Sequence, residues 1–406
     1  MRKLAEYEPI VGKETIDELY LLADRLQGKK IKNINSTAVG GGVAEILNRM
    51  IPFMKELGID ASWDVIKGGD DFFVVTKKFH NALHGRTEEI SKSEYEGFIE
   101  VGRENMKSMD LSADILFIHD PQPIVLIEKK KELANKWIWR CHIDVSNPMP
   151  SLWDFLSPYI EQYDSSVFSS STFAKQLSIP QYLISPSIDP LSDKNRDLTQ
   201  EEIDAVLHRL KIKSDKPIIT QISRFDYLKD PVGVIKVYQL VKKYVDCQLI
   251  LAGGGASDDP EGAQVLEEVY AAAGDDPDIH VLLLPNGSDI EINALQRASA
   301  VVMQKSLKEG FGLTVSEALW KERPMVASSV GGIVLQIAHK FSGLLSHSIE
   351  GTARYVKQIL NDPEYGARLG KNAKEHVRNN YLLTRQLKEY LLLFLALEDQ
   401  KDIVYL

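Results

Sequence analysis

Short apolar runs alternate with amphipathic stretches along most of the chain. In the second half, the runs KPIITQIS and CQLILAG are each followed by a stretch with apolar residues at helical spacing. Such an alternation of strands and helices predicts a mainly parallel, doubly wound sheet. The strands expected in this half lie at 216–223, 247–253, 279–284, 300–304 and 325–329, and the helices lie near 231–244, 261–273 and 289–298.

The first half repeats this pattern, so the sequence predicts two α/β domains. The segment 186–215 is polar, bears prolines and contains no strand, which is typical of a domain boundary. We therefore expect an N-terminal domain at 1–210, a C-terminal domain at 211–381, and a helix within 382–406 that packs back on the first domain. The strands expected in the first half lie near 31–36, 62–67, 114–119, 136–141, 165–169 and 181–185.

Length and charge agree with this division and narrow the partners. A chain of 406 residues is too long for one ordinary core. Its formal net charge of -10 disfavours non-specific binding to nucleic acids or anionic membranes. The start MRKLAEYEPIVGKE lacks the apolar block of a signal peptide, and we expect a cytoplasmic protein without membrane spans. The sequence leaves the oligomeric state open, with a homodimer as one alternative.

The stretch KEGFGLTVSE follows the expected strand 300–304 and has two interpretations. In the first, Thr314 and Glu317 form a Thr-x-x-Glu capping box at the start of a helix. In the second, the glycines around Phe311 bring backbone N–H groups to a helix N-terminus, which attracts phosphate or an oxygen-rich ligand. Glu309, which a capping box does not need, would accept a sugar hydroxyl, and Glu317 in the first helical turn would accept a ribose diol. Both interpretations stay open at this point.

Two further segments carry residues suited to an anion. Arg224 and Lys229 follow the first strand of the second half, where they are either solvated loop charges or cations for a diphosphate. Gly40, Gly41 and Gly42 lie between a strand and a helix, where a backbone cradle for anions can form. This glycine run does not match G-x-G-x-x-G and alone is weak evidence for a nucleotide.

Polar residues also follow two strands of the first half. ILFIHDPQ places His119 and Asp120 at one strand end, and WIWRCHIDVS places His142 and Asp144 at another. These residues are either structural or part of a site that both strand ends face. A metal site is less favoured because no His-x-x-His or Cys-x-x-Cys spacing occurs. A Ser/His/Asp hydrolase is disfavoured because its G-x-S-x-G motif is absent.

Taken together, these motifs resemble the retaining glycosyltransferases of family 4. EGFGLTVSE resembles the Glu, seven residues, Glu signature of that family, and RFDYLKD, GGGVAE and SSVGG fall where it keeps an Arg/Lys pair, a glycine loop and a Gly-Gly turn. The resemblance implies the GT-B fold, in which two Rossmann-like domains hold the active site in the cleft between them. Within the family, NSTAVGGGVAEILNRM and WRCHIDVSNP look most like trehalose synthases and trehalose phosphorylases. One departure is GGIVLQ in place of Gly-Gly-Ile-Pro-Glu, so donor roles are not carried over to Val334 or Leu335.

The resemblance also implies roles for the residues of the site. Arg224 and Lys229 would bind the diphosphate and serve catalysis, Glu317 would hold the ribose, and His142 would lie beside the reacting carbon of the donor sugar. Asp120 and Asp144, together with His142, would bind the acceptor. The remaining donor contacts would come from Gly41, Gly42, Glu309, Gly310, Phe311, Gly312 and Leu313, with Glu309 also counted as catalytic.

The implied reaction moves glucose from a nucleoside-diphosphate glucose (UDP-, ADP- or GDP-glucose) to free glucose and gives trehalose, reversibly. It requires neither a metal nor a permanently bound cofactor. The alternatives are a trehalose phosphorylase, a transferase with another acceptor sugar, a nucleotide-sugar 2-epimerase, and a non-catalytic sugar-nucleotide binding protein. The sequence does not identify the preferred base, because the segment expected to contact it, LLLPNGSD, has no distinctive side chain.

Overall fold

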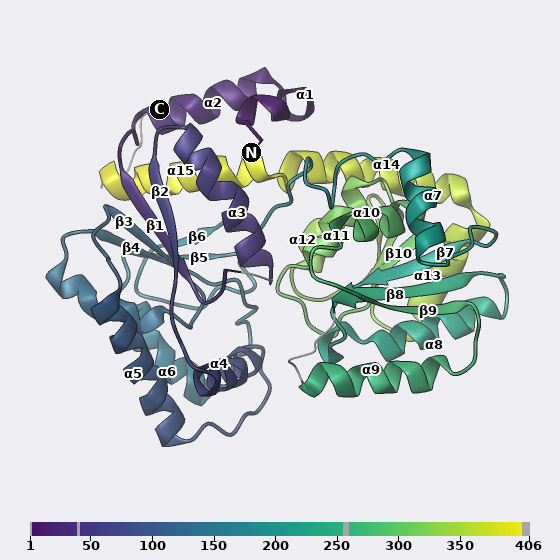
Figure 1. Ribbon diagram of the computed structural model, residues 1–406, viewed down its shortest axis with the longest axis horizontal. Coiled ribbons are helices and arrows are strands. Elements are labelled where there is room, and N and C mark those ends of the chain that lie inside the picture. Colours follow the sequence, from purple (N-terminus) through teal and green to yellow (C-terminus); the bar gives the residue numbers. More distant parts are fainter. Residues whose placement is uncertain (1, 39–40, 255–259, 400–406) are drawn as a thin grey trace. The chain divides into compact units, whose positions relative to one another are not determined.

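The computed structural model describes residues 2–38, 41–254 and 260–399 (Figure 1). The chain divides into two compact units. One comprises Met1–Pro186 together with Leu383–Leu406, and the other comprises Ser187–Leu382. In the described part of the chain, each unit is built around a parallel six-stranded sheet.

The sheet of the first unit has the strand order β2-β1-β3-β4-β5-β6. One face is covered by α2, α3 and α15, and the other by α4, α5, α6 and η2 (Figure 1). Because helices cover both faces, every residue of the central strand β3 is buried. The elements of this unit are η1 (Leu4–Tyr7), α1 (Glu8–Val11), α2 (Lys13–Asp24), β1 (Lys30–Asn35), α3 (Gly41–Glu56), β2 (Asp60–Val65), α4 (Asp70–Leu83), α5 (Lys92–Ser108), β3 (Ile115–His119), η2 (Ile124–Glu132), β4 (Lys136–Arg140), α6 (Pro150–Ile160), β5 (Ser165–Phe168), β6 (Gln181–Leu183) and α15 (Leu383–Asp399).

The sheet of the second unit has the strand order β12-β11-β10-β7-β8-β9. Helices α8, α9 and α13 lie on one face, and α7, α10, α11 and α14 lie on the other (Figure 1). The elements of this unit are α7 (Gln200–Arg209), β7 (Ile218–Ile222), η3 (Tyr227–Lys229), α8 (Pro231–Lys242), β8 (Gln248–Gly254), α9 (Pro260–Ala273), β9 (Ile279–Leu284), α10 (Asp289–Ala298), β10 (Val301–Gln304), α11 (Leu313–Trp320), β11 (Met325–Ser328), α12 (Ile333–Gln336), β12 (Leu344–Ser346), α13 (Ile349–Asn361) and α14 (Pro363–Asn380).

Both sheets have a point at which the strand order reverses. In the first sheet it lies between the neighbours β1 and β3, and in the second between the neighbours β7 and β10. Open parallel sheets bind their ligands beyond the carboxyl ends of the strands at such a point. The topology of each unit therefore marks one edge of its sheet as the place to look for a site.

The predicted α/β class, with two doubly wound domains, is confirmed. The expected strands in both halves match observed ones, as do the expected helices near 231–244, 261–273 and 289–298. The sequence analysis names no element between 330 and 381, where α12, β12, α13 and α14 lie. No helix in the described ranges is long and apolar enough to cross a membrane.

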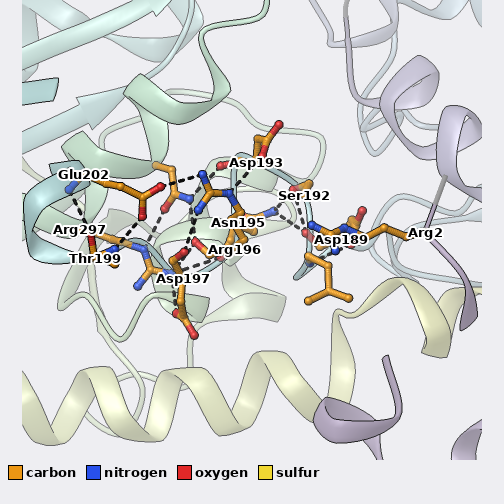
Figure 2. A network of polar contacts seen from close by, with 12 residues as sticks. Arg2, Asp189, Ser192, Asp193, Asn195, Arg196, Asp197, Thr199, Glu202 and Arg297 are labelled. Carbon is orange, nitrogen blue, oxygen red and sulfur yellow. Dashed lines mark hydrogen bonds and ion pairs between the residues drawn. The ribbon is translucent and has the colours of Figure 1, made fainter. Parts of the chain in front are cut away.

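The segment 187–210, which the sequence analysis assigns to the first domain, belongs to the second unit. A polar network explains why (Figure 2). Arg297 of α10 donates from Nη2 to the carbonyl oxygens of Asn195 (3.3 Å) and Arg196 (3.0 Å). Asn293, on the same helix, donates to the carbonyl oxygen of Arg196 at 2.8 Å. The polar segment at the predicted domain boundary is thus attached to α10 by hydrogen bonds.

Candidate active site

Two loops of the second unit lie at its point of reversal, one after β7 and one after β10. The first carries Arg224 and Lys229, and the second carries Glu309 and the Gly-Phe-Gly turn. Lys229 Nζ lies 2.5 Å from Glu309 Oε2, and the two side chains are 18% and 9% exposed. The structure therefore brings together a predicted cation and a predicted carboxylate that are 80 positions apart in the sequence.

A second ion pair connects the same two loops. Lys305 Nζ lies 2.5 Å from Asp230 Oδ2. The other carboxylate oxygen of Asp230 accepts the N–H of Gly233 at 3.0 Å and so caps α8, which begins at Pro231. Neither Lys305 nor Asp230 was proposed from the sequence. The signal for Asp230 was present, because Asp followed by Pro is a common helix start.

The buried side chain of Gln221 connects the two loops. It is 1% exposed and sits next to the last residue of β7. Its Nε2 donates to the carbonyl oxygen of Lys229 at 2.9 Å, and its Oε1 accepts the N–H of Lys305 at 2.7 Å. A single amide thus fixes the backbone on both sides of the Lys229–Glu309 pair. Sequence reasoning missed it because a glutamine inside an apolar strand carries no motif.

Arg224 differs from the other cations of this edge. Its side chain is 63% exposed, and its Nη2 lies 3.7 Å from Asp226 Oδ2. Lys229 and Lys305 each have a close carboxylate partner, whereas Arg224 extends into solvent. Its five N–H donors in a planar fork suit the oxygens of a phosphate.

A chain of side-chain hydrogen bonds orients Glu309. Ser306 Oγ donates to Glu309 Oε2 at 3.1 Å, and Gln304 Nε2 donates to Ser306 Oγ at 3.0 Å. Thr314 Oγ1 in turn donates to Gln304 Oε1 at 3.1 Å. Lys229 and Ser306 both use Oε2 of the carboxylate. Oε1 takes part in none of these bonds, which leaves it for a hydroxyl donor.

The capping-box interpretation of KEGFGLTVSE is wrong. Helix α11 begins at Leu313 with Gly312 as its N-cap, and the Thr314 side chain bonds Gln304 instead of the helix backbone. Gly312 has φ +82°, a left-handed conformation that favours glycine. The position expected for Glu317 is corrected too, because it is the fifth residue of α11 and lies in the second turn.

Glu317 is almost completely buried. It is 2% exposed, and its Oε1 lies 3.9 Å from Lys194 Nζ. Lys321, four residues later, donates to the Glu317 carbonyl oxygen at 3.1 Å and to Asn195 Oδ1 at 2.9 Å. Burying a charged carboxylate costs free energy. A partner or a functional contact must therefore compensate for the burial of Glu317.

The Gly-Gly turn of SSVGG packs directly on the Glu309 loop. Gly331 has φ +50°, and a Cβ placed there would lie 1.7 Å from the Glu309 carbonyl oxygen. The N–H of Gly332 donates to that oxygen at 3.2 Å. Gln336, which is fully buried, donates to the Phe311 carbonyl oxygen at 2.5 Å and accepts from Ser316 at 2.5 Å. The turn therefore supports the backbone of the loop, while Val334 is 40% exposed.

The predicted residues of the first unit gather around two histidines. His119 ends β3, His142 follows β4, and their Nδ1 and Nε2 atoms lie 3.1 Å apart. His119 Nε2 lies 3.0 Å from Asn33 Oδ1 on β1. Asp120 has φ +65°, and its Oδ1 accepts the N–H of His142 at 2.8 Å. The structure thus joins His119, Asp120 and His142 into one hydrogen-bonded group.

The acid–base state of this group is unusual. Burial lowers the pKa of His119 to about 3, with the charge of Arg140 as the second cause. The same two causes, with His119 as a third, hold the pKa of His142 well below its usual value. Burial raises the pKa of Asp120 to about 7, against the opposing effects of the His142 N–H and of Arg140. At neutral pH both imidazoles are therefore uncharged.

The first unit contains two further predicted sets of residues, Asp144 and the glycine run. Asp144 accepts the N–H of Ser146 at 2.9 Å, which is a local turn contact. Gly41 and Gly42 form the start of α3, whereas Gly40 lies outside the described residues. An α-helix leaves its first N–H groups without intrahelical partners, so the start of α3 retains the donors expected of an anion cradle.

Comparison with known proteins shows the family to which the chain belongs. Residues 33–175 match the family model "Trehalose synthase, N-terminal domain", and residues 203–376 match "Glycosyl transferases group 1". The chain is 42% identical to trehalose synthase of Thermococcus litoralis over 400 residues, which cover 96% of each protein. It is 30% identical to trehalose phosphorylase of Grifola frondosa, covering 92% of this chain and 58% of that protein.

The fold also has close neighbours among solved structures. Sucrose-phosphate synthase from Thermosynechococcus elongatus superposes with a TM-score of 0.73 at 16% identity, covering 92% of this chain and 100% of that one. At this identity the likeness concerns the fold alone, and it confirms the GT-B architecture.

Proposed function

Because the chain belongs to the trehalose synthase family of glycosyltransferases, we propose that it forms trehalose by moving glucose from a nucleoside-diphosphate glucose to free glucose. The anomeric configuration of the transferred glucose is retained, and the reaction is reversible. The second unit binds the nucleotide sugar, and the first unit binds the acceptor. The observation that carries this proposal is the Lys229–Glu309 pair at the point of reversal, with Arg224 on the same loop as Lys229.

Lys229 and Arg224 bind the diphosphate of the donor. Lys229 shares its ammonium with Glu309 at 2.5 Å and still has N–H donors for a phosphate oxygen. Arg224 adds a delocalised charge from the exposed side of the loop. As the bond to the anomeric carbon breaks, negative charge grows on the diphosphate, and both cations stabilise it more in the transition state than in the ground state.

The carboxylates and the glycine turn take the sugar parts of the donor. Oε1 of Glu309 and the backbone N–H groups of Phe311, Gly312 and Leu313 are placed at the start of α11 to meet glucose hydroxyls. Gly310 belongs to the same loop, and Gly41 and Gly42 add donors from the first unit. Glu317 accepts the two hydroxyls of the ribose, since an ionised carboxylate offers only acceptors. The burial of Glu317 supports a fixed, specific contact of this kind.

The first unit supplies His142, Asp120 and Asp144 for the reacting sugars. His142 lies beside the anomeric carbon of the donor, and Asp120 and Asp144 bind hydroxyls of the acceptor glucose. The departing phosphate oxygen takes the proton of the attacking hydroxyl on the same face of the sugar, so no carboxylate of the protein needs to attack. A neutral His142 fits this scheme, because an imidazolium would oppose the positive charge that develops on the glucose ring.

A trehalose phosphorylase is the nearest alternative, and a transferase for another acceptor sugar is the next. Glu317 favours a nucleotide donor, since glucose 1-phosphate has no ribose diol for a buried carboxylate to hold. We further expect no loss of rate on adding a metal chelator, because Arg224 and Lys229 neutralise the diphosphate. Action in the cytoplasm and assembly into a homodimer stay expectations; analytical ultracentrifugation tests the second.

The direct test is to incubate the protein with UDP-, ADP- or GDP-glucose and unlabelled glucose and to identify the product by NMR. We expect α,α-trehalose and release of the nucleoside diphosphate, with no product when glucose is omitted. Trehalose broken down with inorganic phosphate, in the absence of any nucleotide, would show a phosphorylase instead. A disaccharide formed only with fructose or a sugar phosphate would overturn the proposed acceptor.

A further inference from the structure

The hydrogen bonds around His142 form a chain that begins inside the first sheet. Asn33 Oδ1 lies 3.0 Å from His119 Nε2, and His119 Nδ1 lies 3.1 Å from His142 Nε2. Asn33 and His119 are 1% and 2% exposed, so water does not compete for these bonds. The backbone N–H of His142 is fixed separately by Asp120 Oδ1 at 2.8 Å. Both the ring and the main chain of His142 are therefore held in place.

The direction of each bond in this chain follows from its first member. An amide oxygen only accepts, so His119 donates its Nε2–H to Asn33. His119 is neutral because burial lowers its pKa to about 3, and its Nδ1 therefore carries a lone pair. His142 must then donate its Nε2–H to that lone pair. Because His142 is neutral as well, its Nδ1 carries no proton.

We propose that Asn33 and His119 are positioning residues that hold His142 in its Nε2–H tautomer and leave Nδ1 as an acceptor for a sugar hydroxyl. In the described part of the chain, the side-chain hydrogen bond of His142 uses Nε2 and not Nδ1. That the ligand is a sugar rests on the proposed function, whereas the tautomer is a property of the free protein. An acceptor at this position orients a hydroxyl and cannot protonate a departing oxygen. His142 thus acts by positioning substrate, and proton transfer is left to the phosphate.

Fully buried Arg140 supports this arrangement. It ends β4, two residues before His142, and its Nη2 donates to Ser169 Oγ at 3.3 Å. Its Nε and Nη1 have no partner among the described residues, so its charge is poorly neutralised. A cation held so close opposes protonation of both imidazoles. The hydrogen bond between His119 and His142 therefore forms between two neutral rings.

The first test reads the tautomer directly. Protein labelled with ¹⁵N-histidine and free of substrate is examined by NMR, and His119→Gln and His142→Gln identify the two sets of signals among the nine histidines. We expect both residues to be neutral Nε2–H tautomers throughout the range from about pH 6 to 8 in which an ordinary histidine titrates. If the amide of Asn33 were reversed, its N–H would donate to His119 Nε2, and both histidines would then be Nδ1–H tautomers. Finding His142 as the Nδ1–H form, or finding that it titrates in this range, overturns the proposal.

The second test removes the start of the chain. Asn33→Leu should give His142 a mixture of tautomers and lower kcat about tenfold, the factor carried by one hydrogen bond, with an unchanged Kd for the nucleoside diphosphate. Asn105→Leu is the matched control, because Asn105 is 3% exposed and bonds the backbone of Lys67 on a different part of the first unit. It should leave the tautomer and kcat unchanged, whatever it does to stability. An Asn33→Leu protein that keeps the tautomer and loses activity would make Asn33 merely structural.

The two tests separate this inference from the proposed function. If the protein shows the expected tautomer but forms no trehalose, the positioning role stands and the proposed function is wrong. If the protein forms trehalose while His142 is in the Nδ1–H form, the proposed function stands and the positioning role is wrong.

Discussion

The two sheets carry their candidate residues at the same topological place but in opposite electrostatic states. At the edge of the second sheet, Lys229 and Lys305 each pair with a carboxylate at 2.5 Å. At the edge of the first sheet, His119 and His142 meet as neutral rings, and burial holds the pKa of each below its usual value. The fold thus determines where a site forms, and the side chains determine whether that site handles charge or hydroxyl groups.

The substrates proposed above differ in the same way, since the donor carries a charged diphosphate and the acceptor glucose is neutral. A diphosphate needs cations whose own charge is balanced before it binds, and the pairs of the second unit provide that balance. A sugar needs directional donors and acceptors, which neutral groups supply without a cost for burying charge. Each prediction below changes one of the two edges and asks whether the other responds.

The largest effect is expected for Lys229→Met. Loss of this cation should lower kcat by about a hundredfold to a thousandfold, because it stabilises charge that grows on the leaving diphosphate. It also leaves the nearly buried Glu309 without its ion-pair partner, which should cost about 3 kcal/mol of stability. Steady-state kinetics and urea unfolding measure the two losses separately.

The double variant Lys229→Met/Glu309→Gln is the control for this experiment. It removes both charges and should regain most of the stability without regaining kcat. If kcat returned with stability, Lys229 would serve only to neutralise Glu309.

His142→Ala should lower transfer about a hundredfold, the cost of a misplaced reacting group, and leave binding of the nucleoside diphosphate unchanged, because it alters only the neutral edge. Calorimetry with the diphosphate alone measures the binding. Arg224→Ala provides the contrast, since it should weaken diphosphate binding as well as kcat while leaving the melting temperature unchanged at a side chain that is 63% exposed. His280→Ala, a partly buried histidine of β9, serves as the control. Equal losses of binding and turnover in His142→Ala would assign His142 a structural role.

Glu317→Gln should weaken donor binding by about tenfold to a hundredfold. It removes the charge from a carboxylate proposed to accept two ribose hydroxyls, and a charged hydrogen bond is worth about 1.5 to 3 kcal/mol. Glu375→Gln on α14 is the control, because that side chain is 56% exposed. Donor Kd and melting temperature are measured on both variants. A Glu317→Gln protein that melts lower but binds UDP-, ADP- and GDP-glucose like the wild type would refute the ribose contact.

The sequence was sufficient for the α/β class and for the strands up to 329, because apolar periodicity is a local signal. It also singled out Arg224, Lys229, Glu309 and Glu317, since each lies in or beside a glycine turn or a strand end; their roles in the site stay predictions. What it missed are residues that act through partners far away in the chain. Gln221 accepts a backbone N–H 84 positions away, and Asn33 bonds a histidine 86 positions away. No local pattern records such a pair, because it exists only once the sheet has formed.

Two errors of interpretation have a different origin. Thr314 and Glu317 match a capping box by spacing, yet the helix starts at Leu313 because Gly312 adopts the left-handed conformation that ends the loop. The segment 187–210 was assigned to the first domain, yet its carbonyl groups bond α10 of the second unit. In both cases the residue types were read correctly, and their partners could not be known.

The smallest expected effect concerns stability as a function of pH, and it tests the neutral edge itself. Burial raises the pKa of Asp120 from 3.8 to about 7, so between these values the folded protein keeps a proton that the unfolded chain has released. Its contribution to stability is therefore full below about pH 4 and is lost as the pH rises to 7. His119 acts in the opposite sense, because its pKa falls from 6.5 to about 3, and its contribution is gained as the pH rises through that range.

Unfolding free energies of the wild type, Asp120→Asn and His119→Gln from pH 3 to 8 separate the two groups. The wild type minus Asp120→Asn difference should fall by about 1 to 2 kcal/mol as the pH rises, at roughly 1.4 kcal/mol per pKa unit reduced by solvent at a partly exposed carboxyl. The wild type minus His119→Gln difference should rise. A flat difference for Asp120 would mean that it is ionised like an ordinary carboxylate, and the first edge would then carry a charge just as the second does.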